Sequence, residues 1–129
     1  MRIGEVAEAA GTTTKTLRFY EGAGLLPAAG RTPAGYRDYG PEVLGRLAFI
    51  RRGQAAGLTL AQIRQVLDIR DGGEPPCEHV TDLLTARLED IDRQITQLQE
   101  LRATVAGLRE QAATGDPAAC PPGAVCRYL

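Results

Sequence analysis

Aromatic side chains are scarce in this chain of 129 residues: Trp is absent, and aromatic residues make up only 5% of the sequence. Hydrophobic residues of all kinds reach 43%, which is enough for the core of one small domain with an appended element. A large, aromatic-rich enzyme core is therefore not expected. The chain has a single His, and no pairing of a nucleophile with a base is recognisable, so the sequence predicts no enzyme.

Long apolar runs are also missing. Residues 1–11 lack the apolar stretch of a signal peptide, and no segment approaches the roughly 20 apolar residues of a membrane span. We therefore expect a cytoplasmic protein without membrane contact. Thiols stay reduced in that compartment, so its three cysteines indicate metal binding or redox chemistry rather than a disulfide framework.

Charge is unevenly distributed along the chain. Residues 1–60 carry eight Lys and Arg against five Asp and Glu, whereas residues 61–129 carry seven against eleven. A basic first half and an acidic second half predict a polyanionic partner for the first half only.

The first 22 residues have the pattern of a helix-turn-helix. Ile3 to Ala10 has apolar residues at helical spacing, and Gly11 ends that segment. Thr12 or Thr13 is suited to cap a second short helix, from Lys15 to about Gly22.

Residues 26–39 lack a helical pattern, because Pro and Gly interrupt them repeatedly. Two short strands around a turn near 33–35 fit this segment. Pro41 then opens a helix that Gly57 stops. Thr59 and Gln62 form a capping box for the next helix, which is expected to run to about Ile69 before a Gly- and Pro-rich break.

The longest uninterrupted segment is an expected helix over 79–112. Its apolar residues alternate at intervals of three and four: Leu84, Leu88, Ile91, Ile95, Leu98, Leu101, Val105 and Leu108. A helix of roughly 50 Å cannot bury this seam within so small a chain. We therefore expect pairing with a second copy in a two-fold homodimer; the alternative, an intramolecular hairpin, lacks a second long helix.

Cations and phenols are concentrated near the start of the chain, at Lys15, Arg18, Tyr20, Arg31, Tyr36 and Arg37. Arg and Lys neutralise phosphates, and Tyr hydroxyls can bind phosphate oxygens. Lys15 and Arg18 are three positions apart on one short helix, so both side chains can face one groove of DNA.

Several spaced motifs resemble the signature of the MerR (mercury-resistance regulator) family. They are Thr-Leu-Arg-Phe-Tyr-Glu at 16–21, Gly-Leu-Leu at 24–26, Gly-Tyr-Arg-Asp-Tyr at 35–39, Leu-Ala-Phe-Ile at 47–50 and Gly-Leu-Thr-Leu at 57–60. The resemblance covers essentially the whole chain in order, including the long helix and the tail with two cysteines.

This resemblance implies a mainly α fold. The expected parts are a winged helix-turn-helix DNA-binding domain (1–70), a linker (71–78), an antiparallel coiled-coil dimerisation helix (79–112) and a metal-binding loop and tail (113–129). In the family, the helix with Lys15, Arg18 and Tyr20 enters the major groove, and the wing with Tyr36 and Arg37 grips the flanking backbone. Two-fold symmetry implies a palindromic promoter operator, whose distortion realigns the elements that RNA polymerase contacts.

The same resemblance implies an effector site made of cysteines. Antiparallel pairing places Cys77, which is expected to precede the long helix, beside Cys120 and Cys126 of the other chain. Thiolates select soft or borderline metals such as zinc, cadmium, lead or mercury, and a Cys at position 77 is typical of the family's divalent-ion sensors. His79 is a further candidate ligand, and zinc is the first choice of metal.

One departure from the family pattern concerns the tail. Relatives carry a loop cysteine near position 112, where this chain has Ala112, so Cys126 is expected to supply the missing thiolate. A thiol-based redox or electrophile sensor is the alternative function. An iron–sulfur site would need about four cysteines, and a multidrug sensor would need an extra domain after the long helix.

Overall fold

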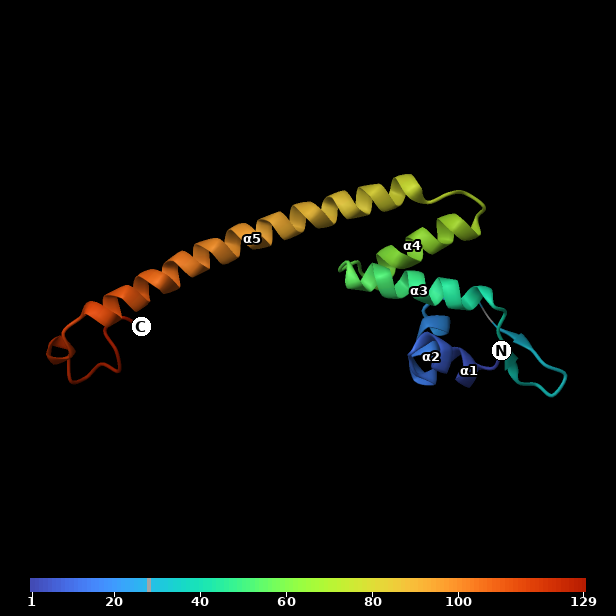
Figure 1. Ribbon diagram of the computed structural model, residues 1–129, viewed down its shortest axis with the longest axis horizontal. Coiled ribbons are helices and arrows are strands. Elements are labelled where there is room, and N and C mark those ends of the chain that lie inside the picture. Colours follow the sequence, from blue (N-terminus) through green and yellow to red (C-terminus); the bar gives the residue numbers. More distant parts are fainter. Residues whose placement is uncertain (28) are drawn as a thin grey trace. The chain divides into compact units, whose positions relative to one another are not determined.

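A computed structural model of the chain describes residues 1–27 and 29–129; Ala28, within the predicted wing segment, lies outside the described residues. The chain divides into two compact units, Met1–Arg87 and Leu88–Leu129. The fold is mainly helical, as predicted, with the elements α1 (Ile3–Ala10), α2 (Thr14–Gly22), β1 (Gly30–Arg31), β2 (Arg37–Asp38), α3 (Glu42–Ala55), α4 (Leu60–Asp71), α5 (Cys77–Thr114) and the short 3-10 helix η1 (Pro117–Ala119) (Figure 1).

The helix-turn-helix is defined by local hydrogen bonds. Gly11 takes the left-handed conformation (φ 66°), which lets the Thr12 N–H reach the carbonyl of Ala7 at 2.9 Å and closes α1. The Thr13 hydroxyl accepts the Thr16 N–H at 3.1 Å and begins α2. The predicted end of α1 is confirmed, and of the two candidate caps Thr13 is the one used.

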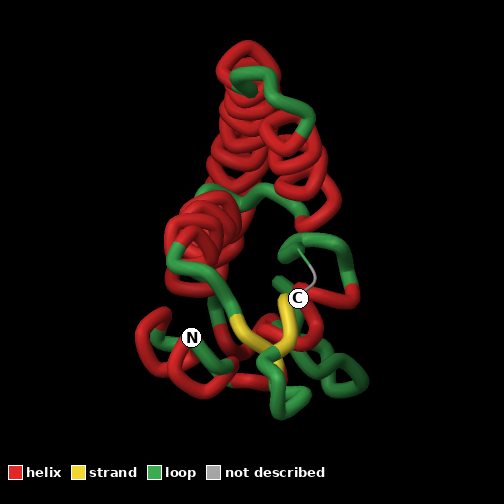
Figure 2. The backbone as a smooth tube through the Cα atoms, turned by 90° about the vertical axis from the view of Figure 1, so that its right-hand side faces the viewer, coloured by secondary structure: helices red, strands yellow, loops and turns green. Residues whose placement is uncertain are grey.

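The wing is a two-stranded antiparallel hairpin with Gly30 opposite Asp38 (Figure 2). Its turn is closed between Thr32 and Tyr36: the Thr32 N–H donates to the Tyr36 carbonyl at 2.7 Å, and the Thr32 hydroxyl accepts the Tyr36 N–H at 3.1 Å. Gly35 lies inside this turn at φ 85°, a conformation that favours glycine. The strands and turn expected for this segment are therefore present.

Helix α3 is the centre of the first unit, because α1 and α4 both pack against it. The predicted Thr59–Gln62 capping box is present, with hydrogen bonds of 2.9 and 3.1 Å at the start of α4. The largest fully buried side chains of the core are Leu17, Leu25, Ile50, Ile63 and Val6. They join the helix-turn-helix to α3 and α4, so the first unit has a core of its own.

Helix α5 is longer at both ends than the predicted segment 79–112. It begins at Cys77, so the expectation that Cys77 precedes the helix is wrong. The carbonyl of Pro76 accepts the Val80 N–H at 2.9 Å, and a proline just before the first turn costs nothing because the first N–H groups of a helix have no partner within it.

No residue of α5 is buried within the described part of the chain. Leu88 and Leu98, both on the predicted seam, are 62% and 64% exposed. Within residues 1–27 and 29–129, no helix is long and apolar enough to span a membrane.

Candidate nucleic-acid interface and thiol loop

Helix α2 presents three of the predicted DNA-binding residues. Lys15 and Arg18 are exposed, while Tyr20 is half-buried and its hydroxyl donates to Gln54 Oε1 at 3.2 Å. Phe19, which is not among the residues predicted from the sequence, is 59% exposed on the same helix. An exposed phenylalanine next to a cation is suited to contact a thymine methyl group, whereas Lys15 and Arg18 provide the charge.

The wing carries the other three predicted DNA-binding residues, Arg31, Tyr36 and Arg37. Arg31 donates from Nη1 to the carbonyl of Gly35 at 3.1 Å, which holds its guanidinium along the turn. Tyr36 is exposed, and Arg37 Nη1 lies 3.7 Å from Glu21 Oε2 on α2. The ion pair between Arg37 and Glu21 therefore ties the wing to the helix-turn-helix.

A second contact reinforces this tie. The Tyr39 hydroxyl donates to Glu21 Oε2 at 2.7 Å, and the Tyr39 side chain is buried. Burial, followed by the hydrogen bond and the charge of Glu21, raises the pKa of Tyr39 above its ordinary value of 10.0. Glu21 therefore serves as an anchor for two wing residues.

The helix-turn-helix and the wing meet at a cavity of about 340 Å³. Its lining is Arg2, Ile3, Arg18, Arg31, Gly35, Tyr36 and Arg37. The structure therefore brings Arg18 together with Arg31, Tyr36 and Arg37, whereas Lys15 and Tyr20 do not line this cavity. Arg2 was missed from the sequence; its only signal there was its share in the positive charge of residues 1–60.

The two tail cysteines lie in the second unit and line a common cavity. Cys120 and Cys126 line a cavity of about 310 Å³ together with Ala112, at the end of α5, and Asp116. The phenol of Tyr128 lies against Gly115, so the tail folds back on itself. All three cysteines are free thiols.

Cys77 and His79 lie in the first unit, at the first and third positions of α5. Two positions on a helix are about 200° apart, so the two side chains diverge. Cys77 is exposed, whereas His79 Nε2 is buried without a hydrogen-bond partner. Among residues 1–27 and 29–129, no three His, Cys, Asp or Glu side chains of a single chain form a group that could hold a metal ion.

Two family models match this chain. "MerR HTH family regulatory protein" matches residues 1–69, and "MerR, DNA binding" matches residues 44–108. The mercuric resistance operon regulatory protein of Bacillus cereus is 38% identical over 110 residues, which are 85% of this chain and 83% of that protein.

Solved structures agree with these matches. The transcription regulator PbrR691 from Ralstonia metallidurans CH34, in complex with lead(II), has a TM-score of 0.78 at 37% identity and covers 93% of this chain and 94% of its own. HiNmlR, a MerR family regulator bound to promoter DNA, has a TM-score of 0.59 at 25% identity, with 94% and 96% covered. The sequence resemblance is thereby confirmed, and the chain belongs to the MerR family of helix-turn-helix transcription regulators, which are not enzymes.

Proposed function

We propose that the chain is a metal-responsive transcription activator that binds a palindromic promoter operator as a homodimer. In this proposal a soft divalent ion (zinc first; cadmium, lead or mercury otherwise) binds cysteines contributed by both chains. The bound dimer distorts the operator so that RNA polymerase can use the promoter. Relatives support the effector class, since one is named as a mercuric resistance regulator and another was solved with lead(II).

The observation that carries the metal site is the placement of two cysteines at one cavity of the tail. Cys120 and Cys126 share one cavity of the tail, yet no three ligands form a metal-binding group within the described part of one chain. In this proposal the third thiolate comes from a second chain, and Cys77, which is exposed, supplies it. The ion supplies a positive charge that binds thiolates of two subunits; Cys77, Cys120 and Cys126 supply the donor set that selects it.

The DNA-binding proposal depends on the exposed cations of the first unit. Lys15 and Arg18 lie on α2 for the major groove, and Tyr20 supports that helix through Gln54. On the wing, Tyr36 together with Arg31 and Arg37 meets the flanking phosphates. The unburied apolar seam of α5 supports the homodimer, because an exposed leucine row of this length needs a partner.

In vitro transcription tests the effector site. The reduced homodimer is titrated with zinc, cadmium, lead, mercury and copper(I) on its promoter. We expect a divalent ion to activate transcription and Cys77→Ser to abolish activation without changing operator affinity. A full response by Cys77→Ser would contradict the inter-subunit site, and activation by copper(I) alone would contradict the divalent assignment.

His79 is the remaining candidate donor: its Nε2 is buried without a partner in the single chain, but its side chain diverges from that of Cys77 on α5, so a shared ion would require a rearrangement of the first turn. A His79→Gln variant tests this in a competition assay against a chromophoric zinc chelator. We expect weaker zinc binding by about ten-fold or more if the imidazole is a ligand. An unchanged affinity would remove His79 from the ligand set.

The exposure of Cys77 and Cys126 also favours the second candidate, a redox or electrophile sensor. The two functions separate in one measurement: with all metal chelated, a thiol oxidant such as diamide is added to the transcription reaction. Activation under these conditions would assign the response to thiol oxidation. No response to the oxidant, with activation by a divalent ion, supports the metal sensor.

A further inference from the structure

The cavity between the helix-turn-helix and the wing is lined by four arginines from separate parts of the chain. Arg2 lies at the start of α1, Arg18 on α2, Arg31 on β1 and Arg37 on β2. Within the described part of the chain, no carboxylate lines this space. Glu21, which pairs with Arg37 at 3.7 Å, is not among the lining residues. The cavity therefore gathers four positive charges, and Glu21 offsets only the one on Arg37 from outside the lining.

Arg2 has a second role in this cavity. Its guanidinium carbon lies 4.4 Å from the centre of the Tyr36 ring, within the range of a cation–π contact. The Tyr36 N–H donates to the Thr32 hydroxyl, which holds the backbone of Tyr36 in place. The stack with Arg2 then restricts the rotation of the exposed Tyr36 side chain. Arg2 thus connects the start of α1 to the turn of the wing.

Like charges that converge on one concave surface repel each other, and an anion relieves this repulsion. A phosphodiester group suits the site chemically, because the planar guanidinium donates two parallel N–H groups to phosphate oxygens. The Tyr36 hydroxyl is a further donor for a phosphate oxygen.

We propose that Arg2 is a further DNA-binding residue. It closes an arginine-lined cavity that takes a phosphodiester group of the operator backbone, and it positions Tyr36 for the same contact. This inference rests on the proposed DNA-binding function and adds a residue and a ligand subsite to it.

The start of α1 does not depend on the Arg2 side chain. Helix α1 begins through main-chain atoms of this residue: its N–H donates to Glu5 Oε1 at 3.1 Å, and its carbonyl accepts the Val6 N–H at 3.0 Å. The Arg2 side chain is exposed. A substitution at position 2 therefore leaves the helix start in place and changes only the guanidinium.

The test compares Arg2→Gln with the wild-type homodimer and with Arg102→Gln, a matched charge removal at an exposed position of α5. Binding is measured between 50 and 200 mM salt on a duplex that the wild-type protein selects from random sequences, and on an unrelated duplex. The logarithm of the binding constant falls with the logarithm of the salt concentration, and each lost phosphate contact makes this negative slope shallower by about 0.9. A homodimer has two copies of Arg2, so we expect the slope of Arg2→Gln to be shallower by about 1.8. The loss should be similar on both duplexes, since a phosphate carries no base sequence.

A double-mutant cycle tests the positioning role. Tyr36→Leu and Arg2→Gln are measured singly and together on the selected duplex. If Arg2 holds Tyr36, the double variant loses less affinity than the product of the two single losses. Strictly multiplicative losses would contradict the positioning role.

Two different outcomes separate an error in the Arg2 assignment from an error in the DNA-binding proposal. If wild-type protein binds the selected duplex, Arg18→Gln weakens that binding, and Arg2→Gln keeps the wild-type slope, then the Arg2 assignment alone is wrong. If the wild-type dimer selects no duplex and its binding is insensitive to salt, the DNA-binding proposal itself is overturned.

Discussion

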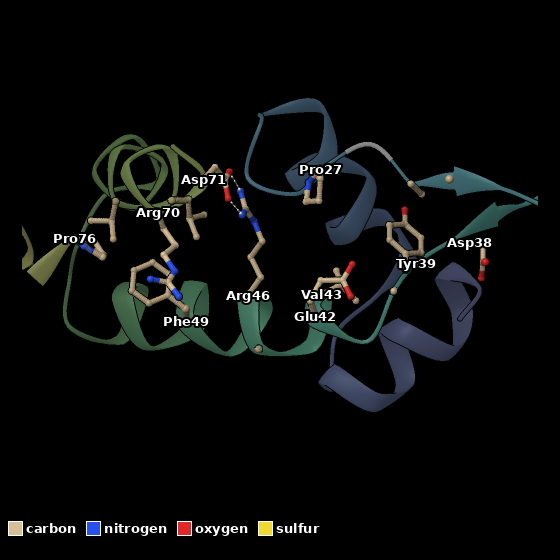
Figure 3. Close-up of a pocket in the computed structure, with 16 residues that line it drawn as sticks. Pro27, Asp38, Tyr39, Glu42, Val43, Arg46, Phe49, Arg70, Asp71 and Pro76 are labelled. Atoms are coloured by element: carbon tan, nitrogen blue, oxygen red, sulfur yellow. Dashed lines mark hydrogen bonds and ion pairs between the residues drawn. The ribbon is translucent and has the colours of Figure 1, made fainter. Parts of the chain in front are cut away.

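Arg46 on α3 and Asp71 at the end of α4 form a two-pronged ion pair, with Nη1–Oδ1 and Nη2–Oδ2 distances of 2.7 and 2.9 Å (Figure 3). The same guanidinium donates from Nε to the carbonyl of Leu25 at 2.6 Å. One side chain therefore connects α3, α4 and the segment after α2. The pair lines a cavity of about 690 Å³ whose wall also includes Phe49 and Leu67.

This pair makes part of the stability depend on pH. The hydrogen bond from Arg46 is the main cause that lowers the pKa of Asp71 below its ordinary value of 3.8. A lowered pKa contributes stability that is present above the unfolded-state value and is lost as pH falls through the folded-state value. Because Asp71 is 53% exposed, we expect Asp71→Asn to cost about 1 kcal/mol or less at pH 7.

Urea unfolding measures this cost as a function of pH. The difference between wild type and Asp71→Asn should begin to shrink as pH falls below about 4 and should vanish only once pH is below the lowered folded-state pKa of Asp71. Arg46→Gln should cost more, because it also loses the bond to the Leu25 carbonyl, and that part should persist in acid. An Asp71→Asn cost that is the same at pH 7 and in acid would contradict the ion pair.

Tyr39 should titrate later than an ordinary tyrosine. Burial and the hydrogen bond to Glu21 raise its pKa, so its contribution to stability is present below pH 10.0 and is lost as pH rises through the folded-state value. In an ultraviolet difference titration of the four tyrosines, we expect one late phase that is absent from Tyr39→Phe. A late phase that survives in Tyr39→Phe would show that another phenol is the source.

Gly57 should be intolerant of a side chain. Its φ is 85°, and a Cβ there would lie 2.5 Å from Arg87 Nε, which donates to the Ala56 carbonyl at 3.0 Å. The left-handed conformation alone costs a non-glycine residue about 1–2 kcal/mol. We expect Gly57→Ala to lower the free energy of unfolding by about that amount. Gly45→Ala, at an exposed helical position with open space, serves as the control and should be neutral or stabilising.

The seam of α5 should determine the oligomeric state. Leu98 and Leu101 are 64% and 56% exposed in the single chain, so we expect Leu98→Glu to dissociate the homodimer by placing a charge in an apolar interface. Sedimentation velocity at micromolar concentration measures the change. Gln97→Glu adds the same charge beside the seam and should remain dimeric; a Leu98→Glu dimer as stable as wild type would exclude this seam.

Local features were predictable from the sequence because each depends on neighbours a few positions apart. The end of α1 at Gly11, the Thr59–Gln62 box and the turn near 33–35 follow from main-chain geometry and short-range hydrogen bonds. The start of α5 was two residues off, since the prolines at 75 and 76 break the preceding segment and yet fit just before a first helical turn.

The residue pattern alone predicts the succession of helices and wing, the cationic residues near the start of the chain and the apolar seam of α5. The packing of these elements establishes which residues meet: Arg2 with Tyr36, Glu21 with Tyr39, and Arg46 with Asp71. It also establishes that Cys120 and Cys126 line one cavity. Such pairs are separated along the chain and depend on how elements pack around the core, which periodicity and caps do not encode.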